Sequence, residues 1–297
     1  MRVDPNISSL LNIGIQGTEQ ALNTAVQQVA SGERVNVPSD DPAAAAANLQ
    51  SLAGSANVDR YTQNGDAVLS QAQMADSALS NVVSELNQAI TLGTQGADGS
   101  MTNENRAAIA TQVQSVLSEV ISQANTTFNG ASLFAGTAGT VPAFATDSTS
   151  PTGYSYQGNS GVNSAAIGDN LQVNVNVPGD QIFSNPNGDV LGSLSQLISA
   201  LGSGTTTDIG DAVNAVRSAL TNVSQQRVVY AGVVNQVNAQ ESYLSQETIS
   251  LSGQQQSLTG VDMSVAVSNL TQAQIAHSTI LAAAAKVLPT SLLDYLN

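Results

Sequence analysis

The sequence predicts a mainly α protein: an elongated, coiled-coil-like helical bundle with a small β-rich insertion. Three observations predict this class. Apolar residues recur in alternating steps of four and three in both halves of the chain. Aromatic residues make up only 3% of it, too few for the thick core of a compact globule, which relies on large rings. A Gly- and Asn-rich stretch with strand-like alternation separates the two helical halves.

The N-terminal half carries the helical pattern as a stripe of apolar residues. The stripe runs from Leu11 to Val29, and a break follows it. Asp41 then stands where it can cap a helix whose first residue is Pro42. The four-three pattern resumes over 68–89, which predicts a second helix.

The C-terminal half carries the longest stripe. A turn predicted by composition over 93–100 ends the second helix. The stripe over 209–258 spans about seven heptads, which is typical of a coiled-coil-like helix about 75 Å long. Gly260 can end this helix and Asp262 can cap the next one, whose stripe continues until Pro289. Polar residues interrupt the long stripe at Arg227, Glu241, Thr248 and Gln255.

The middle of the chain reads as strands. Leu171, Val173, Val175 and Val177 alternate with polar residues, as in a half-buried strand. Because the stripes on either side are complete without this segment, we expect the helices to fold without it. The predicted organisation has five parts: an N-terminal assembly helix (1–40), the first part of a helical rod (41–129), a β-rich outer domain (130–188), the second part of the rod (189–261), and a C-terminal assembly helix (262–297) that pairs with the first.

The residues needed for catalysis or for cofactor and metal binding are missing. The chain has no Cys, a single His and a single Lys. His277 lies on the apolar stripe, where a packed or interfacial role is expected, and Lys286 follows four alanines rather than a phosphate-binding loop. The pair Asp40–Asp41 could be a carboxylate dyad, but its place before Pro42 favours a helix cap. We therefore expect no enzyme activity, no cofactor and no metal site.

Charge excludes two further classes of partner. The net charge is −15, with only seven Lys and Arg residues, which are scattered along the chain. Nucleic acids and anionic membranes bind clustered cations, so neither is expected as a partner. No stretch reaches the roughly 20 apolar residues of a membrane span, and the N-terminus does not resemble a secretory signal.

The two ends differ from the rest of the pattern. Each carries an apolar stripe, yet two helices alone leave much of an apolar face uncovered, and such a face typically marks an interaction site. We expect the subunit interface to include Leu11, Ile15, Leu22, Val29, Leu270, His277, Ile280, Val287, Leu292, Leu293, Tyr295 and Leu296.

Several segments resemble the bacterial flagellin family. RVNVPSDDPAAAAANLQ (34–50), which includes Arg34, Asp40, Asp41 and Pro42 as a structural motif, is similar to the family's N-terminal segment. The tail from Met263 is similar to its C-terminal segment. SLLDYL, NGASLFAGT, YSYQG, IGDN and VNVPGDQIF resemble the flagellin-like hook–filament junction proteins, the third hook-associated proteins, although Pro142 and Phe144 are not adjacent as they more often are in that group.

The resemblance implies a place and a set of partners. It implies export through the flagellar secretion system without a cleaved signal peptide, a C-terminal segment that binds an export chaperone, and an extracellular position in the flagellum. There the chain would self-associate in a ring or helical assembly and join another hook-associated protein to flagellin subunits. Two alternatives stay open: a filament flagellin, and a cytosolic coiled-coil scaffold.

Overall fold

The protein is described by a computed structural model that covers the backbone of residues 5–293 and the side chains of residues 9–286. Its helices are α1 (Pro5–Ser31), α2 (Pro42–Gly96), α3 (Asn103–Ala124), α4 (Gly179–Phe183), α5 (Val190–Ser203), α6 (Thr206–Thr259) and α7 (Met263–Leu293). Its strands are β1 (Thr127–Phe128), β2 (Ala131–Ser132), β3 (Phe144–Thr146), β4 (Tyr154–Tyr156), β5 (Ser164–Gly168), β6 (Leu171–Asn174), β7 (Ser184–Asn185) and β8 (Gly188–Asp189). The predicted class, mainly α with a small β-rich part, is confirmed.

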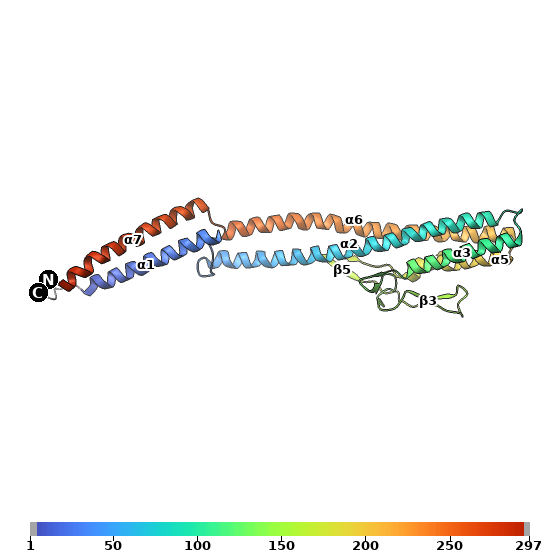
Figure 1. Cartoon of the computed structure of the whole chain (residues 1–297), viewed down its shortest axis with the longest axis horizontal. Helices are drawn as coiled ribbons and strands as arrows, with labels where there is room; N and C mark the ends of the chain where they lie inside the picture. Colours follow the sequence, from blue (N-terminus) through green and yellow to red (C-terminus); the bar gives the residue numbers. More distant parts are fainter. Residues whose placement is uncertain (1–4, 294–297) are drawn as a thin grey trace. The chain divides into compact units, whose positions relative to one another are not determined.

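The chain divides into two compact units. The first consists of 1–57 together with 246–297, and the second of 58–245. In the first unit α1 and α7 lie side by side (Figure 1). In the second, α3 packs along α5, and α2 and α6 run beside each other. The long helix expected over 209–258 is confirmed as part of α6.

The caps of the long helices are local and readable in the sequence. The backbone N–H of Ala44 donates to Asp41 Oδ1 at 3.0 Å, so Asp41 caps α2 as predicted. Asp262 accepts from the N–H of Ser264 at 2.8 Å at the start of α7. After α1, Gly32 takes a positive φ of 73°, which suits a residue just past a helix end.

Two helix ends differ from the prediction. The turn expected over 93–100 begins later, because α2 continues to Gly96. A Cβ on Gly93 would lie 2.5 Å from Val213 Cγ2, so glycine serves here for close helix packing rather than for a turn. At the other end, α7 continues past Pro289 to Leu293, although an interior proline removes a helical hydrogen bond and crowds the carbonyl four residues before it.

The β-rich segment consists of short antiparallel hairpins: β1 with β2, β3 with β4, β5 with β6, and β7 with β8. In β4, Tyr156 pairs with Phe144 of β3. The strand expected over 171–177 is shorter, since β6 ends at Asn174 and Val175 already bonds outside the hairpin, to the carbonyl of Asn163 at 2.8 Å.

One hydrophobic core joins the β-rich segment to the helices. Phe183, fully buried, meets Phe134 edge-on with ring centroids 5.5 Å apart, and Phe144 at 5.6 Å. These rings belong to the same cluster of buried residues as Leu79 of α2 and Leu194 of α5. The aromatic rings of the β-rich segment thus lie in the same core as the helices. That the helices fold without this segment stays a prediction, and the shared core argues against it.

Buried polar contacts fix this segment to α6. The side-chain amide of Asn222 donates to the carbonyls of Ile182 at 2.9 Å and Gly188 at 3.3 Å. The Tyr230 hydroxyl accepts from the N–H of Val177 at 3.1 Å. Burial raises the pKa of Tyr230 to about 12, so the phenol stays neutral in this position.

Polar residues in the long stripe meet partners on α2. Arg227 makes two hydrogen bonds to the Asp76 carboxylate, at 2.8 and 3.2 Å. The Gln255 amide donates to Ser55 Oγ at 3.0 Å. Such fixed cross-helix pairs set the register between neighbouring helices where apolar packing alone is permissive.

Candidate assembly interface

The two terminal helices form a seam along their predicted stripes. On α1 the residues of the seam are Leu11, Ile15, Leu22 and Val29, and on α7 they are Leu270, His277 and Ile280; all seven are half-buried. The structure thus brings these predicted residues together within one chain. Val287, Leu292 and Leu293 lie in α7 but outside the described side chains, and Tyr295 and Leu296 lie outside the described residues.

Small and polar groups let the two helices approach closely. A Cβ on Gly14 would lie 2.4 Å from Ile280 Cδ1, so α7 packs directly on the backbone of α1 there. One turn away, Thr18 Oγ1 lies 3.2 Å from His277 Nδ1, and the same hydroxyl donates to the carbonyl of Ile15 at 3.0 Å. His277 therefore has a packing and hydrogen-bonding role across the seam.

The segments that follow α1 and precede α7 bond to each other. The N–H of Arg34 donates to the carbonyl of Thr259 at 2.6 Å, and that of Val261 to Gly32 at 3.1 Å. The Arg34 guanidinium adds a bond to the carbonyl of Leu258 at 2.9 Å. This connection holds the end of α1 against the start of α7.

The predicted structural motif stabilises the same connection. Arg34 forms an ion pair with Asp41 at 3.1 Å. The backbone N–H of Ala44 and then the Arg34 guanidinium lower the pKa of Asp41. Asp40 accepts from the backbone N–H groups of Asn36 and Val37, each at 3.0 Å. Both carboxylates are thus engaged in hydrogen bonds of the local structure.

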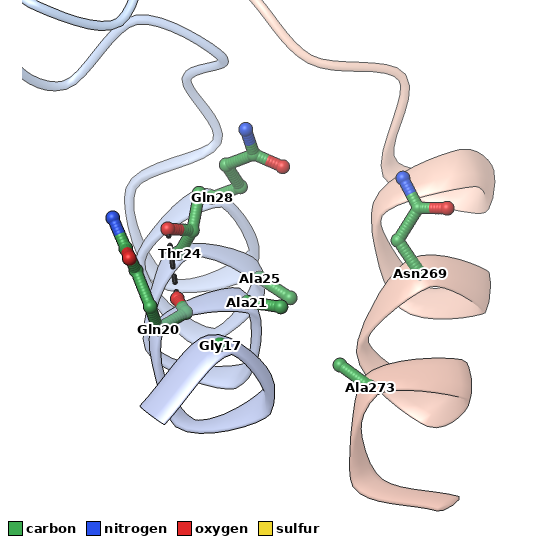
Figure 2. Close-up of a pocket in the computed structure, with 8 residues that line it drawn as sticks. All are labelled: Gly17, Gln20, Ala21, Thr24, Ala25, Gln28, Asn269 and Ala273. Carbon is green, nitrogen blue, oxygen red and sulfur yellow. Dashed lines mark hydrogen bonds between the residues drawn. The ribbon is translucent and has the colours of Figure 1, made fainter. Parts of the chain in front are cut away.

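An open groove of about 440 Å³ runs along one side of the seam. Figure 2 shows its wall on α1, where Gly17 and Ala21 leave room beside the polar Thr24, and its wall on α7, formed by Asn269 and Ala273. No atom would meet a Cβ built on Gly17 within 4 Å. Within the described part of the chain, nothing fills this space.

Large apolar side chains that the prediction missed lie outside the seam. Leu10 is 62% exposed and Ile13 is 66% exposed. They precede Gly17 by seven and four residues, which places them on the same side of α1 as the groove. Among the described side chains of α7, the exposed large apolar residues are Met263, Val265, Val267, Ile275 and Leu281. The sequence did contain a signal for these exposed residues: they are apolar, yet they fall between the four- and three-residue steps of the main stripe. Apolar side chains at such positions cannot pack in a seam between two helices.

Charge is nearly absent from both helices. Glu19 is the one charged residue in the sequence of α1, and Lys286 is the one Lys, Arg, Asp or Glu in that of α7. A helix whose outer face stays in water typically carries many charged residues there. The combination of exposed apolar groups, an open groove and few charges is typical of a surface that another protein covers.

The described residues show neither a metal centre nor a membrane span. No group of three or more His, Asp or Glu side chains that could hold a metal ion occurs among them. None of the helices, over the part of the chain described, is long and apolar enough to cross a bilayer.

Sequence relatives of this chain are flagellar proteins. Flagellin B of Helicobacter pylori is 30% identical over 138 residues, 46% of this chain, and the chain spans only 27% of its length. A flagellin of Listeria innocua is 25% identical over 94% of this chain and 93% of its own. Flagellar hook-associated protein 3 of Escherichia coli is 31% identical over 37% of this chain and 35% of its own.

Solved structures share the fold. The flagellar junction protein FlgL of Legionella pneumophila superposes with a TM-score of 0.62 at 15% identity, over 72% of this chain and all of its own. FlgL of Bacillus cereus gives 0.60 at 18% identity, over 70% and 99%. At such identities the likeness shows the fold.

Two family models match the two ends of the helical body. The bacterial flagellin N-terminal helical region matches residues 6–139, and the bacterial flagellin C-terminal helical region matches residues 213–296. Together the two ranges cover most of the chain and both sides of the seam. The chain therefore belongs to the flagellin family.

Proposed function

We propose that this chain is a structural component of the bacterial flagellum, the adaptor that joins a hook-associated protein to the flagellin filament. It would act without catalysis, by polymerising with copies of itself and with neighbouring flagellar subunits. The surface that carries this role is the α1–α7 pair, including the groove beside Gly17 and the exposed Leu10 and Ile13.

One observation supports assembly more than any other: the terminal helices are almost uncharged while they expose large apolar side chains. Leu10 and Ile13 each remain more than 60% exposed. Covering an apolar side chain of this size contributes about 1.5–3 kcal/mol. Several such groups per subunit, repeated around an assembly, would supply its cohesion.

The junction role is favoured over a filament role by the fold. The Legionella pneumophila structure is that of a flagellar junction protein, and both FlgL structures named above are matched along nearly their whole length. The Listeria innocua flagellin, aligned along nearly all of both chains, favours the second candidate, a filament flagellin. The middle of the chain, where SLFAGT and PGDQIF occur, supports the first.

The assignment of regions follows from this role. Residues 1–40 and 262–297 would form the assembly region, 41–129 and 189–261 the rod, and 130–188 the outer part. We infer export through the flagellar secretion system without cleavage of a signal, and capture of the C-terminal segment by a chaperone during export. Neither nucleic acid nor membrane is among the proposed partners.

Gene deletion distinguishes the two candidates. In the bacterium that carries the gene, loss of a junction adaptor should leave hooks without filaments and release flagellin subunits into the medium, as seen by electron microscopy and by analysis of the culture fluid. Loss of a filament flagellin should instead leave no flagellin of this kind in the medium. Normal filaments after deletion would contradict both candidates.

A substitution on α1 tests the surface itself. Ile13→Glu should block incorporation into flagella, because assembly would bury an unpaired charge, while the melting temperature of the monomer stays unchanged. Asn23→Glu is the matched control: it adds the same charge one turn after Glu19, on the face that already carries one. Equal incorporation of both variants would exclude this side of α1 from the interface.

A further inference from the structure

A polar cavity of about 430 Å³ lies in the second unit. Its walls come from α2, from the β1–β2 hairpin and the loop after it, and from the chain around Asn163 and Asn176. The volume falls within the range of small-molecule sites. The proposed assembly surface lies on α1 and α7, so the assembly role does not explain this cavity.

Three side-chain carboxamides line the cavity, and none has a hydrogen-bond partner within the described part of the chain: Gln71 of α2, Asn129 of the hairpin turn, and Asn163. None of the cavity's lining residues is charged. Asn176 differs, because its Oδ1 accepts from the N–H of Asn163 at 2.6 Å and its Nδ2 donates to the carbonyl of Gly161 at 3.2 Å. One amide thus fixes the wall, and the other three are available.

The cavity also has a buried hydroxyl without a partner. Ser132 lines it and is only 7% exposed, yet Ser132 Oγ makes no hydrogen bond to any residue that the structure describes. A buried polar atom left unsatisfied lowers stability, and native proteins contain few of them. A ligand with hydroxyl groups would supply the missing hydrogen-bond partner of Ser132 Oγ.

The hairpin turn places one amide at the cavity. Phe128 pairs with Ala131, so Asn129 and Gly130 form a two-residue turn with φ values of 51° and 81°. Positive φ at both positions is the turn that favours Asn followed by Gly. The turn holds Asn129 beside Phe128, whose half-buried ring forms an apolar part of the same wall.

We propose that this cavity binds a neutral saccharide. A carboxamide both donates and accepts, as sugar hydroxyls do, so three free amides and a serine hydroxyl match a ring that carries several hydroxyl groups. The aromatic wall suits the apolar face of such a ring. The absence of charge from the lining gives no attraction for anions or cations.

The test is a titration of the full chain with glucose, galactose, mannose and N-acetylglucosamine, monitored by the NMR signals of side-chain amides. At least one of these sugars should produce saturable shifts at the Gln71 and Asn163 amides. Gln71→Ala and Asn163→Ala should each weaken binding about tenfold, the effect of one lost hydrogen bond. Neither side chain has a hydrogen-bond partner among the described residues, so both variants should keep the wild-type circular dichroism spectrum.

Gln196→Ala is the matched control, because Gln196 is an amide that lines other cavities beside α5. It should leave sugar binding unchanged. Three results would overturn the proposal: no saturable shift with any of the four sugars, shifts that persist in both cavity variants, or binding of inorganic sulfate in place of neutral sugars.

Discussion

Removal of the Phe183 ring should unfold helices far from it in the sequence. Phe183 is fully buried between Phe134 and Phe144, within a cluster that includes residues of α2, α3, α5 and α6. Replacement of a buried Phe by Ala costs about 3–5 kcal/mol, from lost transfer energy and from the cavity left behind. For a unit of this size each kcal/mol lowers the melting temperature by about 2–4 °C, so Phe183→Ala should lower it by roughly 6–20 °C.

The assay is urea unfolding followed by the far-ultraviolet circular dichroism of the helices. Because Phe183 lies in the β-rich segment, a helical signal responds only if the two share a core. Tyr243→Ala on α6, whose ring is 58% exposed, is the control and should change the free energy of unfolding by less than about 0.5 kcal/mol. A helical transition in Phe183→Ala that coincides with the wild type would refute the shared core.

Two further predictions concern stability: one tests glycines at helix contacts, and the other tests the Asp41 cap of α2. Gly93→Ala should destabilise the second unit by about 1–2 kcal/mol, because its Cβ would press on Val213. A Cβ on Gly232 of α6 would meet none of the described atoms within 4 Å, so Gly232→Ala should stabilise the unit by about 1 kcal/mol through helix propensity. If thermal unfolding showed a change of melting temperature in the same direction for both variants, the packing argument would be contradicted. Asp41 has a lowered pKa, so its contribution to stability exists above the unfolded pKa of about 3.9 and is lost as pH falls through the folded value. Asp41→Asn should therefore unfold less steeply with acid than the wild type, and parallel acid transitions would show that the cap and the Arg34 ion pair contribute nothing.

Helices were predictable because their signals are local. Steps of four and three appear in the sequence wherever one face of a helix is covered, and α6 follows its stripe almost residue for residue. Asp41 and Asp262 act within four residues of themselves, so their role as caps could be deduced without knowledge of the tertiary structure.

Contacts between distant segments were not predictable. No local pattern shows that Phe183 meets Phe134 and Phe144, or that Asn222 bonds to the carbonyls of Ile182 and Gly188. The composition of the middle segment suggested a separate domain, whereas its few aromatic residues complete the helical core.

The residues that contact other subunits stay a prediction, and the structure shows which of the candidates are already covered within the chain. The seam residues predicted for contact with other subunits, such as Ile15 and Ile280, are already half-covered by the partner helix. The exposed groups, such as Ile13 and Ile275, lie off the main stripe. The apolar stripe of a helix identifies the face that packs on a helix of the same chain. A helix of another subunit must therefore contact the apolar residues that this packing leaves exposed.

Burial along the seam gives a last prediction, about the free subunit. In the described parts of α1 and α7 the fully buried residues are Ala25, Ala266 and Ala284. Alanine buries little apolar area, while ordering each residue costs about 1–2 kcal/mol of backbone entropy. We therefore expect low local stability for this pair in the monomer, with fast hydrogen exchange over both helices.

The second unit should behave differently, because α2, α3, α5 and α6 surround many fully buried Leu, Val and Ile side chains. Exchange should be slow over 68–90 and 209–230 in a verified monomer, and it should become slow over α1 and α7 only after polymerisation. Strong protection of the amides around Leu270 and Ile280 in the monomer would mean that a seam of alanines and half-buried side chains is stable alone. In that case the exposed apolar groups of α1 and α7 would not be needed to order the terminal helices.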